Sequence, residues 1–131
     1  MYVASNPKQF LGQSVGNGQC VAFAKLAANM PQTRLWKRGA LVKGNFSLQA
    51  GAAIATFDAN GAYGNHTDGS SHVAIYLGQD VHGIRVLDQW MSTKMMGGKA
   101  AKVPTNVHER VMYFRQAPRI ENDGNNYYVV E

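Results

Sequence analysis

Residues 16–28 read GNGQCVAFAKLAA, and this stretch decides the fold class. A Gly-Asn-Gly turn precedes an apolar run, and Asn17 is placed to cap the helix that this run predicts. Asn29 and Pro31 end the helix. Because Lys25 is the only charged residue in the run, we expect the rest of the protein to enclose the helix.

Strand patterns follow this helix along the chain. Ala52 to Phe57 is typical of a buried strand, and Asp58 to Ser71 has the composition of a long polar loop. The next two β-rich runs, His72 to Leu77 and Ile84 to Trp90, flank a turn and predict an antiparallel hairpin. Further strands are expected at Val111–Arg115 and Tyr127–Val130. A helix followed by strands predicts an α+β fold in which the helix packs on an antiparallel sheet.

The composition limits the classes of protein that are possible. The 131 residues are 45% hydrophobic and 16% charged, which predicts one folded domain over residues 1–131, and we expect a monomer. No apolar stretch reaches the roughly 20 residues that a membrane-spanning helix needs. Met1 to Phe10 lacks the apolar run of a signal peptide, so we expect synthesis in the cytoplasm without one.

The charge balance favours an anionic partner. Thirteen Lys and Arg against eight Asp and Glu give a net charge of +5. The basic residues are spread along the chain without a run of five or six, which argues against nucleic acid as the partner.

Cys20 and His72 are the candidate catalytic pair. Cys20 lies in the first turn of the predicted helix, where backbone N–H groups lower a thiol pKa from about 8.5 to between roughly 3.5 and 7.5. A lone cysteine is more often an inert core residue. His72 opens a strand directly after a polar loop, where its ring can act as the base.

A third residue must orient the His72 ring, and the hairpin offers one. With the turn centred near residues 80 and 81, even-numbered residues share a face, so Asp88 lies opposite or diagonal to His72. A register shifted by one residue would bring Gln89 there instead. The Cys20 backbone N–H should bind the oxyanion, with Gln19 or Gln13 as a second donor.

These motifs resemble a known family. GQCVAFA at residues 18–24, followed by SHVAIYLG at residues 71–78, is similar to the NlpC and CHAP class of papain-like cell-wall amidases. The run VLDQW at residues 86–90 resembles the small type VI secretion amidase effectors. Many NlpC-type enzymes have a second histidine as the third group, where this chain has Asp88.

The resemblance implies a function. It implies a papain-like domain that hydrolyses an amide bond of the peptidoglycan stem peptide or crosslink, with no cofactor and no metal. It also implies delivery by type VI secretion into the periplasm of a target bacterium, and a cognate immunity protein as inhibitor. The smaller effector group favours the D-alanyl crosslink over the bond between D-glutamate and diaminopimelate.

The substrate groove is expected along two segments. Thr33 to Ser47 has no clean period and, with the loop Asp58 to Ser71, could line a groove. We expect Trp36, Lys37 and Trp90 to contact substrate there, and loop cations and amides to recognise stem-peptide carboxylates.

Two other functions are compatible with the sequence. His66, Asp68 and His72 could ligate zinc in a metal-dependent cell-wall peptidase, although no His-Glu-x-x-His helix is present. Alternatively, the basic surface and the aromatic residues Trp36, Tyr63 and Trp90, which we expect to be exposed, could hold glycan or single-stranded nucleic acid without catalysis. Replacing Cys20 by Ala distinguishes the second alternative from an enzyme.

Overall fold

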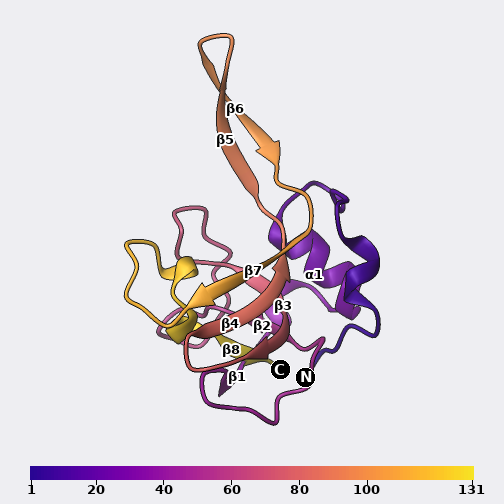
Figure 1. Ribbon diagram of the computed structural model, residues 1–131, viewed down its shortest axis with the longest axis vertical. Coiled ribbons are helices and arrows are strands. Elements are labelled where there is room, and N and C mark those ends of the chain that lie inside the picture. The colour runs from indigo at the N-terminus through magenta and orange to yellow at the C-terminus, as the bar shows by residue number, and fades with distance from the viewer.

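The computed structural model describes residues 1–131 and has one α-helix packed on an antiparallel sheet (Figure 1). The helix is α1 (Cys20–Ala28), and the six-stranded sheet has the order β1-β8-β2-β3-β4-β7. The strands are β1 (Arg38–Leu41), β2 (Ala53–Ala55), β3 (Val73–Gln79), β4 (Gly83–Asp88), β7 (His108–Tyr113) and β8 (Tyr128–Val130). Short 3₁₀ helices lie at Pro7–Phe10, Thr33–Leu35, Ile120–Asn122 and Gly124–Asn126. The predicted α+β architecture is confirmed.

The two faces of the sheet bury two separate apolar clusters. Ile75 and Leu87 are paired across β3 and β4 and belong to the cluster that contains Phe23 of α1. Their neighbours Tyr76 and Val86, also paired, belong to the cluster on the opposite face. Side chains alternate between faces along a strand, so the register decides which residues meet the helix.

The helix is buried on one side only. Phe23, Ala24 and Ala28 are buried, whereas Leu26 is 61% exposed. The expectation that the protein encloses the helix is therefore wrong, because a helix lying on one sheet buries only the face that contacts that sheet. No helix in the chain combines the length and apolar character needed to cross a membrane.

The N-cap of α1 differs from the prediction, whereas the end of the helix at Asn29 agrees with it. Gln19, and not Asn17, is the N-cap, because the Asn17 side chain accepts a hydrogen bond from the Gln19 N–H (3.0 Å) in a turn before the helix. Cys20 is the first helical residue, as expected. Asn29 ends the helix in the left-handed conformation, with φ of 52°.

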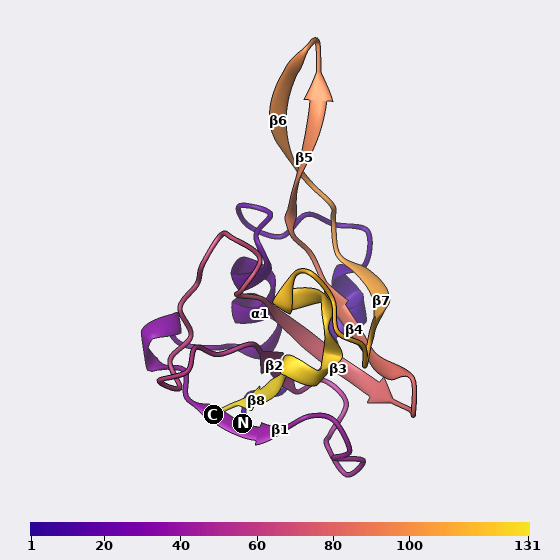
Figure 2. The same cartoon turned by 90° about the vertical axis from the view of Figure 1, so that its left-hand side faces the viewer.

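A second hairpin, which the sequence analysis did not predict, projects from the body of the molecule (Figures 1 and 2). It consists of β5 (Met91–Met96) and β6 (Lys99–Pro104), and Gly97 and Gly98 form its tip with positive φ. Its base packs against the turn before α1, since a Cβ atom added to Gly18 would lie 2.7 Å from the Met91 sulfur. The hairpin therefore stands beside the N-terminus of the helix.

Candidate active site

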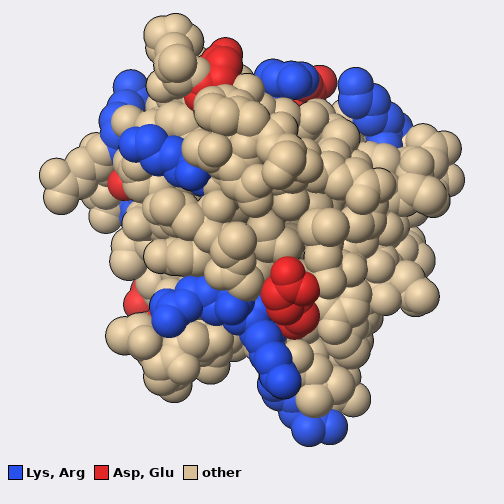
Figure 3. Space-filling model, turned by 90° about the horizontal axis from the view of Figure 1, so that it is seen from below, with Lys and Arg blue, Asp and Glu red and all other residues tan.

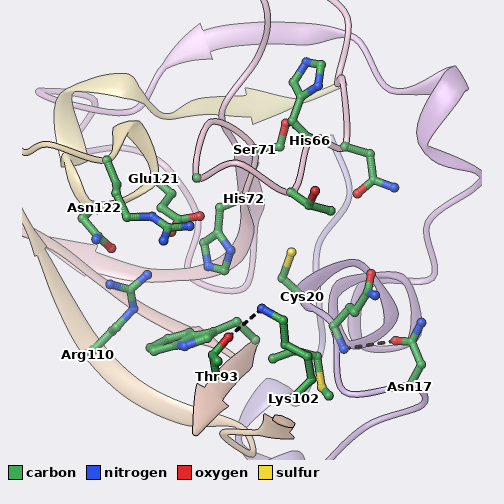
Figure 4. Close-up of a pocket in the computed structure, with 17 residues that line it drawn as sticks. Asn17, Cys20, His66, Ser71, His72, Thr93, Lys102, Arg110, Glu121 and Asn122 are labelled. Carbon is green, nitrogen blue, oxygen red and sulfur yellow. Dashed lines mark hydrogen bonds and ion pairs between the residues drawn. The ribbon is translucent and has the colours of Figure 1, made fainter. Parts of the chain in front are cut away.

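A pocket of about 580 Å³ opens at the N-terminus of α1 (Figure 4). Its walls come from the turn before the helix, the loop that precedes β3, the base of the β5–β6 hairpin and the segment 119–122. Cys20 and His72 both line it. Residues far apart in the sequence therefore surround one cavity.

Cys20 is half-buried, and its thiol points into this pocket. The first N–H groups of a helix have no partner within the helix, so those at the start of α1 are free to bind a negative charge. Burial would raise the pKa of the Cys20 thiol, but the charge of the adjacent His72 and hydrogen bonding to it lower the pKa overall. The Tyr63 hydroxyl lies 4.0 Å from the sulfur.

His72 is 3% exposed and comes directly before β3. Its backbone N–H donates to the Thr56 hydroxyl (3.0 Å), and its Nε2 lies 2.7 Å from Asp88 Oδ2. Nδ1 is thus the ring nitrogen left for Cys20. Burial alone would lower the pKa of His72, but the Cys20 thiolate and the Asp88 carboxylate raise it to about 10. This arrangement favours a thiolate–imidazolium pair.

Asp88, at the end of β4, is fully buried. Ile75 pairs with Leu87, and extending this register along the two strands places His72 diagonal to Asp88. This agrees with the prediction that the even-numbered residues share a face. Burial would raise the pKa of Asp88, but hydrogen bonds and charge from His72 and Arg110 hold it below the usual value. The carboxylate therefore stays ionised near neutral pH.

Arg110, on β7, is a site residue that the sequence analysis missed. Its Nε donates to Asp88 Oδ2 at 2.9 Å, and a terminal guanidinium nitrogen lies 2.8 Å from the same oxygen. The guanidinium also covers the Trp90 ring, 4.9 Å from its centroid, and His108 packs on Trp90 at 4.8 Å. The only signal for this residue is the pairing of β7 with β4, which depends on the sheet order.

The Gln89 side chain does not bond to His72, for which the sequence analysis named it as a reserve partner. It is fully buried and bonds to the backbone around the helix N-terminus: the Val15 N–H (2.9 Å), the Val15 carbonyl (2.8 Å) and the Gln19 carbonyl (2.8 Å). Adjacent strand residues point to opposite faces, so Gln89 cannot face His72 when Asp88 does. Its contacts hold the turn before Cys20 against β4.

The two candidate oxyanion donors are separated by the structure. Gln19 lines the pocket next to Cys20, and its side chain has no hydrogen bond within the protein. Gln13 is exposed, bonds to the Gln9 carbonyl (3.2 Å) and does not line the pocket. Only Gln19 remains a candidate for a second donor.

Two of the three residues expected to contact substrate, Trp36 and Lys37, lie outside the pocket. Trp36 is 3% exposed, donates to the Pro31 carbonyl (2.9 Å) and packs on Tyr63, so it belongs to the core behind Cys20. Lys37 exchanges backbone hydrogen bonds with Glu131 away from the pocket. Trp90 does line the pocket. The segment after Thr33 contains β1, which is an edge strand of the sheet and pairs with β8.

The residues proposed for the zinc alternative do not converge. His66 Nε2 is bonded to Asp58 (2.9 Å), Asp68 accepts from the Ser70 N–H (3.0 Å), and His72 faces Asp88. No three His, Cys, Asp or Glu side chains in the chain are placed to share a metal ion. On the face opposite the hairpin, Lys and Arg form several separate groups, the longest of which is a continuous band (Figure 3).

Comparison with known proteins identifies the family of this chain. Residues 1–130 match the family described as Domesticated amidase effector 2. The chain belongs to this family. The chain is 35% identical over 133 residues to the type VI secretion amidase effector 2 protein of Salmonella typhi, and the match covers 99% of this chain and 98% of that protein.

A solved structure of type 6 secretion amidase effector 2 (Tae2) is similar to the same extent. The two chains are 34% identical, with a TM-score of 0.78 and coverage of 99% of this chain and 94% of the other. The resemblance to small type VI secretion amidase effectors and the papain-like fold are therefore confirmed.

Proposed function

We propose that this chain is a peptidoglycan amidase that uses Cys20 as nucleophile and His72 as its proton acceptor and donor. The observation that carries the proposal is the buried connection from Asp88 through His72 to Cys20 at the wall of a polar pocket. Membership of an amidase effector family supports the reaction class. The pocket's cations suit a peptide substrate that carries carboxylates.

The mechanism follows from the positions of these groups. The Cys20 thiolate attacks the amide carbonyl carbon, and the oxyanion that forms accepts from the Cys20 N–H at the start of α1 and from the Gln19 side chain. The His72 imidazolium then protonates the leaving amine. His72 next takes a proton from the water that attacks the thioester. Collapse of this intermediate releases the carboxylic acid and restores the Cys20 thiolate beside the His72 imidazolium. Asp88 holds the ring through Nε2 and stabilises its positive charge.

The test is hydrolysis of purified cell wall by wild-type protein and by Cys20→Ala and His72→Ala variants. We expect activity to be abolished in both, and retained in Lys37→Ala, which changes a residue outside the pocket. Substantial residual hydrolysis in either of the first two variants would refute the mechanism.

We further propose that the D-alanyl crosslink is the bond cut, which rests on the resemblance to the smaller effector group. Mass spectrometry of digested muropeptides distinguishes the bonds. Crosslinked dimers should disappear while intact tetrapeptide monomers accumulate. Fragments truncated after D-glutamate would instead identify the bond between D-glutamate and diaminopimelate.

The biological setting that we propose is delivery by type VI secretion into the periplasm of a target bacterium, with a cognate immunity protein as inhibitor. The relatives' description as type VI secretion effectors supports this. Expression directed to the periplasm should be toxic and cytoplasmic expression harmless, and Cys20→Ala should abolish toxicity. Co-expression of the immunity protein should restore growth, and size-exclusion chromatography should find a monomer.

A further inference from the structure

Three Lys and Arg side chains line the pocket, and only one of them lacks a carboxylate partner. Arg110 is paired with Asp88, and Arg119 with Glu121 (2.8 Å). Lys102, on β6, has no Asp or Glu oxygen within 4.0 Å, although it lines the same pocket as Cys20. The pocket therefore has one positive charge that the protein does not neutralise.

The hairpin holds Lys102 in place. Thr93 lies directly across from it on β5, and the Lys102 ammonium donates to the Thr93 hydroxyl (2.8 Å). Figure 4 shows this side chain reaching into the pocket. A neutral hydroxyl positions an ammonium without cancelling its charge, and at least one N–H of the ammonium stays free for a ligand.

The register separates Lys102 from the other lysines of the hairpin. Lys94 pairs with Ala101 and Lys99 with Met96, and these positions alternate with the Thr93–Lys102 pair. Neighbouring pairs of a hairpin point to opposite faces, so Lys94 and Lys99 point away from the face that lines the pocket. They carry the same charge on the same hairpin and neither lines the pocket.

We infer that Lys102 is a specificity residue that binds a free carboxylate of the stem peptide next to the scissile amide. This rests on the proposed amidase function. A single unneutralised ammonium facing a substrate pocket selects for an anionic group, and a substrate in which that group is amidated leaves the ammonium unpaired. Lys102 thus acts by binding the substrate and has no part in proton transfer.

The experiment compares two synthetic crosslinked stem-peptide fragments that differ only in whether the carboxylates flanking the scissile bond are free or amidated. Wild-type protein should prefer the free acid by about tenfold in kcat/KM, mainly through KM. Lys102→Gln should reduce this ratio to near one. Lys94→Gln and Lys99→Gln should keep it, and all three should melt within about 3 °C of wild type because the residues are exposed.

The outcomes separate this inference from the function on which it rests. An unchanged preference in Lys102→Gln, or an equal loss in Lys94→Gln, would overturn the specificity role while the amidase function stands. If wild-type protein cleaves neither fragment nor purified cell wall, the amidase function fails and the inference fails with it. Cleavage of both fragments at equal rates by wild type overturns the inference alone.

Discussion

Replacing Asp88 by Asn tests how much of the site depends on one buried negative charge. The carboxylate is fully buried and accepts from His72 Nε2 at 2.7 Å and from Arg110 at 2.8 and 2.9 Å. The substitution is nearly isosteric, so it removes charge more than volume. It weakens the hold on the imidazolium and leaves the Arg110 guanidinium without its counter-ion.

Both activity and stability should therefore fall. A hydrogen bond to a charged group contributes about 1.5–3 kcal/mol, against about 1 kcal/mol for a neutral one. Losing this difference of about 0.5–2 kcal/mol at the His72 imidazolium predicts a fall in kcat of about 2- to 30-fold. Breaking a buried ion pair costs about 3–5 kcal/mol at most, and the retained amide hydrogen bonds reduce this to about 2 kcal/mol.

The assay measures kcat and KM on a synthetic stem-peptide fragment well below the melting temperature, together with urea unfolding. Ile84→Val is the matched control, because Ile84 is a fully buried residue of the same strand and its truncation costs about 1 kcal/mol without touching the site. An Asp88→Asn variant whose kcat equals that of wild type within experimental error would refute the orienting role.

Four further predictions follow from the same contacts. Activity should fall at low pH as the Cys20 thiolate is protonated, and again through about pH 10 as His72 loses its proton, which a pH profile of kcat/KM checks. His72→Ala should move alkylation of Cys20 to higher pH, which the pH profile of iodoacetamide labelling checks. Gln89→Ala should lower the free energy of unfolding by about 3 kcal/mol in urea titrations, because it leaves buried backbone groups near Val15 unpaired. Trp36→Ala should cost about 3–5 kcal/mol of stability with KM unchanged, since its ring is in the core. Hydrolysis should survive a chelator and be lost on thiol alkylation, and the opposite result would favour a metal mechanism.

Local patterns predicted much of the site. The turn before Cys20 and the apolar run after it located the N-terminus of α1 to within two residues. The alternation of strand residues, together with the position of the turn near residue 80, placed His72 and Asp88 on one face. Both inferences depend on geometry within about 20 residues of chain, which the sequence determines directly.

The partners supplied by distant segments could not be predicted in this way. Arg110 reaches Asp88 because β7 pairs with β4 after the chain has passed through the β5–β6 hairpin. Trp36 looked like an exposed aromatic residue because nothing nearby in sequence indicates that Tyr63 covers it.

The sequence by itself determined which residues form the candidate catalytic site and which face of each strand they occupy, because helix and strand periods are local properties of the chain. Only the tertiary structure decided what lies against those faces. It placed an arginine behind Asp88, a buried amide beneath the turn before Cys20, and an unneutralised Lys102 across the pocket. Strand order and hairpin direction result from contacts across the whole chain, and residue periodicity does not record them.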